Sequence, residues 1–167
     1  MVLLAFVVAV SPENTPEKIA QAEEQITQGM DWARKGDAQR AISSFDEAIK
    51  LAPEMAQAYH QRGKAYSILD RREQAIQDFD DAIRLDPQNA QVFFSRGGVS
   101  LDVLGEYQRA KSDYDEAIRL DPDDGVAYYN RAIVHTRLGM DREAQADGLG
   151  FDPSLLENAM NAARTER

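Results

Sequence analysis

The 167-residue sequence contains no cysteine. A chain without a thiol cannot form a disulfide, hold a metal ion through thiolates or use a cysteine nucleophile. The absence does not decide the compartment, because cysteine-free proteins occur in both reducing and oxidising surroundings.

Histidine is nearly as scarce, since only His60 and His135 are present. His135 falls where the helical pattern predicts a packed core residue, and no acid or nucleophile lies one helical turn from His60. The aspartates around Pro122 lack the glycine and the distal glutamate of a calcium loop. We therefore expect no enzyme activity, no metal site and no cofactor.

Positive charge is also in short supply. The 19 lysines and arginines face 29 aspartates and glutamates, which gives a formal net charge of −10 at pH 7. Such a surface repels phosphate backbones, so nucleic acid is not an expected partner. Long apolar runs are missing too: the longest, Val2–Val10, is far shorter than the roughly 20 residues of a transmembrane helix. No stable transmembrane span is expected.

The Val2–Val10 run, within a leader of residues 1–15, allows three interpretations. It is the remnant of an export signal or anchor, a segment that docks on an apolar surface of its own or a neighbouring molecule, or an artefact of the gene start. No lysine or arginine precedes it, and Ser11-Pro12 is a poor cleavage context. The compartment therefore stays open between cytoplasmic and, for an export signal, periplasmic or secreted.

One short sequence motif occurs three times along the chain. An Ala-Ile-basic-Leu run followed by one residue and a proline ends at Pro53, Pro87 and Pro122, which lie 34 and then 35 residues apart. A period of this length without a strand pattern indicates stacked pairs of helices. Each proline follows the second helix of a pair, where it ends one helix and suits the start of the next.

Within each unit, small and large apolar residues alternate at helical spacing. The second helices bear apolar residues at positions i, i+3, i+4 and i+7. These are Ala41, Ile42, Phe45, Ala48 and Ile49, then Ala75, Ile76, Phe79, Ala82 and Ile83, then Ala110, Tyr114, Ala117 and Ile118. We expect Gly29 and Gly63 to face Ala41 and Ala75 across their pairs, because helix axes approach closely only over small side chains.

Glycines mark the turn between the two helices of a unit. Gly36, Gly105 and Gly139 occupy this place, and Asp70 takes it in the second unit. Glycine adopts a left-handed backbone conformation without steric cost, and aspartate tolerates it. We expect a left-handed residue at each of these turns.

The order small, large, small, aromatic, small, proline resembles the tetratricopeptide repeat family. It is carried by Gly63, Tyr66, Ala75, Phe79, Ala82 and Pro87, and in the first unit by Gly29, Trp32, Ala41, Phe45, Ala48 and Pro53. The resemblance covers roughly residues 20–147. It implies an all-α fold, a right-handed α-α superhelix of antiparallel helix pairs, with a domain over 16–152 and units of about 22–55, 56–89, 90–124 and 125–152.

The third unit departs from the pattern by one extra residue. Arg62, Arg96 and Arg131 keep a constant distance from the preceding proline, so the insertion lies in or just after the first helix, near Gly97-Gly98. It is either a bulge in that helix, which often marks a functional site, or a loosened turn.

The fourth unit departs at its second helix. Gly148 stands where the aromatic residue is expected, and Gly148 with Gly150 predicts an early helix end. Asp152-Pro153 then resembles an N-cap and a first turn, and residues 153–167 are predicted to form a C-terminal capping helix over the last unit.

The resemblance also implies where a ligand binds. In this family the concave face is lined mainly by the first helices and holds a peptide or partner segment, so we expect a non-enzymatic interaction scaffold. By position, the groove consists of Met30, Arg34, His60, Gln61, Lys64, Phe94, Ser95, Tyr129, Asn130, Ile133 and Arg137, beside Ile26, Thr27, Ser67, Gln91 and Gly98. The alternative is a self-assembling protein, a homo-oligomer in which residues 1–10 fill a groove of the same or a neighbouring molecule.

One subclass of the family clamps the acidic C-terminus of heat-shock chaperones with lysine, asparagine and arginine side chains. At those positions this chain has Ile26, Met30, Gln61, Gln91 and Ser95. We therefore expect no specificity for chaperone tails.

Overall fold

The computed structural model describes residues 15–101 and 106–149, and within them every regular element is an α-helix. The helices are α1 (Pro16–Arg34), α2 (Ala38–Leu51), α3 (Ala56–Ile68), α4 (Arg72–Leu85), α5 (Ala90–Leu101), α6 (Tyr107–Leu120), α7 (Gly125–Arg137) and α8 (Asp141–Leu149). The predicted capping helix over 153–167, and the leader before Thr15, lie outside the described residues.

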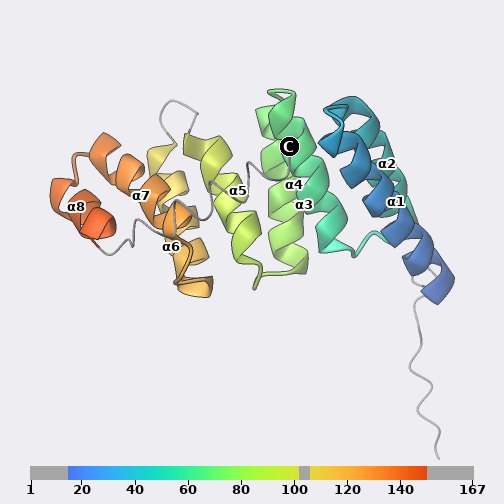
Figure 1. Ribbon diagram of the computed structural model, residues 1–167. Coiled ribbons are helices and arrows are strands. Elements are labelled where there is room, and N and C mark those ends of the chain that lie inside the picture. Colours follow the sequence, from blue (N-terminus) through green and yellow to red (C-terminus); the bar gives the residue numbers. More distant parts are fainter. Residues whose placement is uncertain (1–14, 102–105, 150–167) are drawn as a thin grey trace, which may run out of the picture.

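The helices form four antiparallel pairs that stand side by side in one row (Figure 1). The first helices of neighbouring pairs contact each other, α1 with α3, α3 with α5 and α5 with α7. In the described part of the chain, no second helix contacts another second helix. The first helices therefore crowd together on the inner side of the row, as predicted. We call the surface that α1, α3, α5 and α7 form the inner face.

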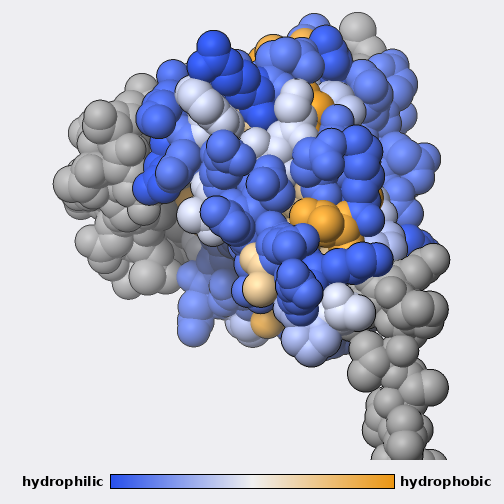
Figure 2. Space-filling model, turned by 90° about the vertical axis from the view of Figure 1, so that its right-hand side faces the viewer, coloured by the Kyte–Doolittle hydropathy of each residue, from blue (hydrophilic) through white to orange (hydrophobic). Residues whose placement is uncertain are grey.

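The row ends at α1 and α2 in a surface that is mostly hydrophilic, with only small hydrophobic areas (Figure 2). Among the described residues no further helix pair packs on this side, and a polar outer face is typical of the end unit of a stacked repeat.

Side-chain caps set where several helices begin. At the start of α1, the Thr15 hydroxyl accepts a hydrogen bond from the backbone N–H of Lys18 at 3.3 Å. At the start of α2, the Asp37 carboxylate accepts one from the backbone N–H of Arg40 at 3.0 Å. Asp124 accepts from the N–H of Val126 at 2.9 Å. These oxygens satisfy N–H groups that have no partner inside the helix.

The turns within the pairs adopt the expected left-handed conformation. Gly36, Asp70 and Gly139 have φ values of 80°, 57° and 72°. Gly105, the fourth residue expected in such a turn, lies outside the described residues.

The extra residue of the third unit does not form a bulge. Helix α5 is a regular α-helix from Ala90 to Leu101, so of the two interpretations of the insertion the bulge near Gly97-Gly98 is excluded and the loosened turn remains. The insertion instead lies between Leu101 and Tyr107, a stretch that includes the undescribed residues 102–105. A change in the connection leaves the backbone hydrogen bonds of α5 intact.

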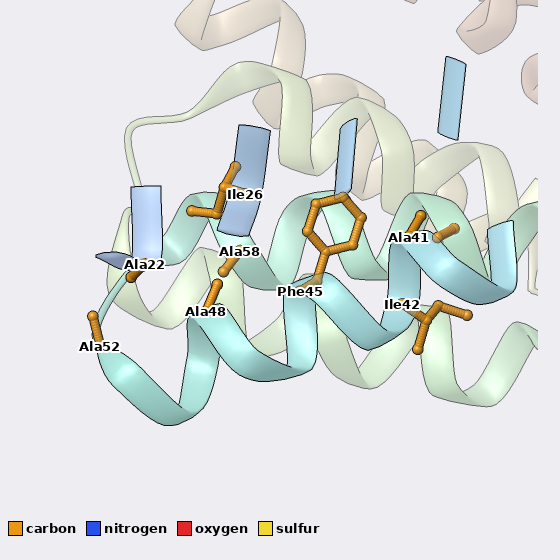
Figure 3. Packing of buried hydrophobic residues seen from close by; sticks show 9 residues of the cluster. Ala22, Ile26, Ala41, Ile42, Phe45, Ala48, Ala52 and Ala58 are labelled. Atoms are coloured by element: carbon orange, nitrogen blue, oxygen red, sulfur yellow. The ribbon is translucent and has the colours of Figure 1, made fainter. Parts of the chain in front are cut away.

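In the first three pairs the core is built around one buried aromatic ring of the second helix, with alanines beside it. In the first pair Phe45 is 1% exposed and projects from α2 into a cluster of alanines and isoleucines (Figure 3). Phe79 and Tyr114 occupy the same place in the next two pairs, and both are fully buried. Ile26 belongs to this core at 3% exposure, so its expected place in the groove is wrong.

Glycine makes room for each ring on the facing helix. A Cβ atom added at Gly63 would lie 2.7 Å from Cε1 of Phe79, and one at Gly29 would clash with the Phe45 ring. The closest groups are thus the rings, which the sequence did not predict, and the backbone oxygen of Ala75 also lies 3.2 Å from the Cβ at Gly63, in agreement with the expected pairing of Gly63 with Ala75.

Helix α8 is described as far as Leu149 and spans nine residues, against fourteen in α2, α4 and α6. Gly148 lies inside it and does not end the helix. The predicted stop at Gly150 falls outside the described residues.

Candidate binding groove

The first helices line two hollows of about 410 Å³ each, and a third of about 360 Å³ is lined by Glu24, Thr27, Gln28 and Asp31 of α1. The first, which we call the α3–α5 hollow, is lined by Lys64, Ser67, Ile68, Asp70, Arg72, Phe79, Phe94, Ser95, Gly98 and Val99. The second is lined by Ile133, Thr136 and Arg137 of α7. These three residues are the counterparts, two units later, of Lys64, Ser67 and Ile68. The two hollows therefore open on the same side of the row.

The residues expected in the groove differ in how much of each side chain is exposed. Met30, Arg34, Lys64, Tyr129 and Arg137 are exposed; Gln61, Phe94, Ser95, Asn130 and Ile133 are half-buried; His60 is buried. The structure brings Lys64, Phe94 and Ser95 together in the α3–α5 hollow, and Ile133 and Arg137 in the second hollow. Met30 and Arg34 line neither of the two, and Arg34 is paired with Asp31.

Sequence reasoning missed Ile68 and Val99, which also line the α3–α5 hollow. Ile68 is 68% exposed, a large fraction for an isoleucine at the end of a packed helix. Helical spacing could have identified Ile68, because it lies one helical turn beyond Lys64 and therefore on the same face of α3.

His60 is buried at 8% exposure and connects two helices, which differs from its expected place at the groove surface. Its Nε2 lies 3.1 Å from Oγ of Ser95, and its ring meets the Phe79 ring edge-on at 5.9 Å. The Ser95 hydroxyl already donates its proton to the carbonyl of Gln91 at 2.7 Å, so it accepts from the Nε2–H of His60. Burial, with a smaller contribution from Lys64, lowers the pKa of His60 to about 4.

This shift predicts that stability falls between pH 7 and pH 5. The unfolded histidine binds a proton below about pH 6.5, whereas the folded one stays neutral to about pH 4, so acid favours the unfolded chain. We expect a loss of about 2 kcal/mol over this range, measured by urea unfolding. His60→Gln, which keeps a donor for Ser95 but does not titrate, should lose markedly less; equal losses in both proteins would contradict the assignment.

A row of buried ion pairs lies between the helix pairs. The guanidinium of Arg62 donates to Asp78 of its own unit at 2.7 Å and to Asp46 of the preceding unit at 2.6 Å. The next two junctions repeat the arrangement with Arg96, Asp113 and Asp80, and then with Arg131, Asp147 and Asp115. We call these three arginines and six aspartates the charge ladder.

Three carboxylates of the ladder, those of Asp78, Asp113 and Asp147, are buried, whereas Asp46, Asp80 and Asp115 remain partly exposed. Asp78 and Asp113 are each 3% exposed, and burial raises the pKa of both carboxyls, although the hydrogen bonds from Arg62 and Arg96 oppose the rise. The hydrogen bond to Asp78 in turn raises the pKa of Arg62 above its already high ordinary value. Each guanidinium therefore compensates a carboxylate that water does not reach.

Within residues 15–101 and 106–149, no group of three or more histidine, aspartate or glutamate side chains is placed to hold a metal ion. In the same ranges no helix has both the length and the apolar character to cross a bilayer.

Comparisons with known proteins agree with this architecture. One model described as tetratricopeptide repeat matches residues 56–89 and 98–124, and a second with the same description matches residues 113–146. A search of curated proteins found no match.

Several solved structures are similar to the whole row of helices. A crystal structure of MamA has a TM-score of 0.73 at 25% identity, covering 86% of this chain and 81% of that chain. The TPR domain of Arabidopsis OM64 gives 0.69 at 25% identity, covering 72% and 98%. The first TPR of Spaghetti (RPAP3), bound to the HSP90 peptide SRMEEVD, gives 0.70 at 21% identity, covering 72% and 95%.

The repeated residue pattern, the row of antiparallel helix pairs and the matching repeat models lead to one conclusion. The chain belongs to the tetratricopeptide repeat family and folds as a right-handed superhelix of helix pairs.

Proposed function

We propose that this protein is a non-enzymatic scaffold that binds a segment of a partner protein along its inner face. The observation that carries the proposal is the exposure of apolar side chains on the face that also contains the two hollows. Ile68, which lines the α3–α5 hollow, is 68% exposed, and Tyr129 and Met30 on the same face are 50% and 37% exposed. Large exposed apolar side chains around a hollow are typical of a surface that another molecule covers.

The chemistry of the face suits an extended polypeptide. Gln61 and Asn130 are half-buried amides, and each offers a donor and an acceptor to a peptide bond. The exposed rings and aliphatic chains supply the area that a ligand would bury. The contact residues we propose are Met30, Arg34, Gln61, Lys64, Phe94, Ser95, Tyr129, Asn130, Ile133 and Arg137, with His60 positioning Ser95 from below.

The repeat fold carries an HSP90 peptide in the RPAP3 structure, but the side chains expected of a chaperone clamp are missing here. We therefore propose a partner other than a chaperone tail.

The double variant Tyr129→Ala/Asn130→Ala tests the proposal. Immobilised wild-type protein should retain partner proteins from a lysate of the source organism, identified by mass spectrometry, and the variant should lose them. Because Tyr129 is half exposed and Asn130 half-buried outside the core clusters, helicity and melting temperature should stay unchanged.

The control is Glu116→Ala/Arg119→Ala, which removes an exposed ion pair on α6 away from the inner face. It should retain the same partners as the wild type. If the inner-face variant keeps its partners, or if it unfolds, the proposed groove is wrong.

A further inference from the structure

One glycine, Gly98, leaves part of the wall of the α3–α5 hollow without a side chain. The equivalent position holds Met30 in the first unit, Lys64 in the second and Ile133 in the fourth, but Gly98 in the third. A Cβ atom added at Gly98 would meet only the hydroxyl oxygen of Tyr114, at 3.8 Å, which is ordinary contact. The fold therefore tolerates a side chain at Gly98, and packing alone does not explain why it is absent.

The floor of the hollow is apolar. Phe79 and Phe94 line it from α4 and α5, together with Val99 and the highly exposed Ile68. Phe94 also packs against the buried ring of Tyr114, with centroids 5.8 Å apart, which holds this wall in place. Such a surface suits an aliphatic or aromatic side chain of a ligand.

The polar side chains that line the hollow have hydrogen-bond or ion-pair partners within the described part of the chain, with the exception of Lys64. The hydroxyl of Ser67 donates to the carbonyl of Gly63 at 2.9 Å, and that of Ser95 donates to Gln91. At the edge, Asp70 is paired with Arg72 at 2.7 Å. Among the described residues Lys64 has no ion pair, and its ammonium is exposed to solvent.

The charged residues that line the α3–α5 hollow are Lys64, Asp70 and Arg72. Asp70 pairs with Arg72, so Lys64 gives the hollow a net positive charge in a chain of net charge −10. A groove of this kind attracts an acidic ligand, while the remaining surface repels one.

We propose that the α3–α5 hollow binds an apolar side chain of an acidic partner segment, and that Lys64 pairs with a carboxylate next to that side chain. This inference rests on the proposed function and specifies the chemistry of the partner. The chain's own Val2–Val10 run is a weaker candidate, because it has no carboxylate and would leave Lys64 without a counter-charge.

Labelled peptides of stated chemistry test the idea by fluorescence anisotropy. The probe is a fluorescein-labelled Ser/Gly peptide with a central Leu-Glu pair, compared with Leu-Gln, Ala-Glu and Leu-Lys peptides and with a peptide of residues 1–14. We expect the Leu-Glu peptide to bind best. Replacing leucine by alanine should weaken binding about tenfold or more, and replacing glutamate by glutamine about threefold.

Two variants connect these preferences to the hollow. Gly98→Met, which introduces the side chain that the first unit has at this position, should weaken Leu-Glu binding about tenfold with little change in melting temperature. Lys64→Met should make the Leu-Glu and Leu-Gln peptides bind equally. Gly148→Met and Lys50→Met, at an open helical glycine and a lysine paired with Glu47 on α2, are the matched controls and should bind like the wild type.

The inference fails if no peptide binds, if Leu-Lys or the 1–14 peptide binds more tightly than Leu-Glu, or if Gly98→Met leaves binding unchanged. The lysate experiment separates this failure from that of the proposed function. Partner capture that depends on Tyr129 and Asn130 but not on Gly98 would support the groove and overturn only the hollow.

Discussion

Replacing Arg62 by methionine should destabilise the fold by about 3–5 kcal/mol, measured by urea unfolding followed by circular dichroism. Methionine removes the guanidinium that pairs with Asp78 and Asp46 and leaves the Asp78 carboxylate, 3% exposed, without its counter-charge. Since a domain of this size has only about 5–15 kcal/mol of stability, much of the total would be lost.

A second substitution should identify the cause of that loss. Asp78→Leu added to Arg62→Met removes the stranded charge, so the double variant should recover a large part of the stability, while Asp46 stays solvated on its exposed side. Arg119→Met breaks a solvent-exposed pair with Glu116 and should change stability by about 0.5 kcal/mol or less. If Arg62→Met is as mild as Arg119→Met, the ladder contributes little.

The ladder matters for the groove because it joins neighbouring units. Each arginine is bound to a carboxylate on both sides of a junction, so it constrains the angle at which one pair meets the next. In the first unit, Gln28 stands at the position equivalent to Arg62, and Ser44 at the position equivalent to Asp78. Both members of this ion pair are thus replaced by neutral residues. The ladder therefore begins at Asp46, and in each of the three described junctions one arginine is shared by two aspartates.

The sequence predicts the helix pairs well because the signals for them are local. Helical spacing of alanines and rings, a proline after each second helix and a glycine or aspartate in each turn depend on neighbours a few residues away. The ladder was not predicted, because each arginine reaches across 16 or 17 residues to another helix. Its signal was nevertheless present: Asp46, Asp80 and Asp115 recur with the same period as the arginines.

The exposure of a side chain on the inner face could not be predicted from its position within a single repeat. Ile26, His60, Phe94 and Tyr129 are equivalent residues, yet Ile26 and His60 are buried, Phe94 is half-buried and Tyr129 is half exposed. The next first helix covers each of the earlier ones, and His60 contacts Ser95 of α5 in this way. In the described residues no first helix follows α7 to cover Tyr129. Burial at this position is thus a property of the stack and not of one helix.

Replacing Gly63 by leucine should cost about 3 kcal/mol, measured by the same urea unfolding. Even the first atom of a side chain would lie 2.7 Å from the Phe79 ring and 3.2 Å from the Ala75 carbonyl, and the ring itself is packed in the core at 1% exposure. The two helices would have to separate, which would disturb α3 and, with it, the wall of the groove.

Two comparisons isolate the steric cause. Gly98→Leu makes the same change on α5 where the space is open, so it should leave stability nearly unchanged or raise it slightly through better helix propensity. Adding Phe79→Ala to Gly63→Leu moves volume from one helix to the other and should cost less than the sum of the two single changes. Equal losses for Gly63→Leu and Gly98→Leu would show that helix separation is not set by the ring beneath the glycine.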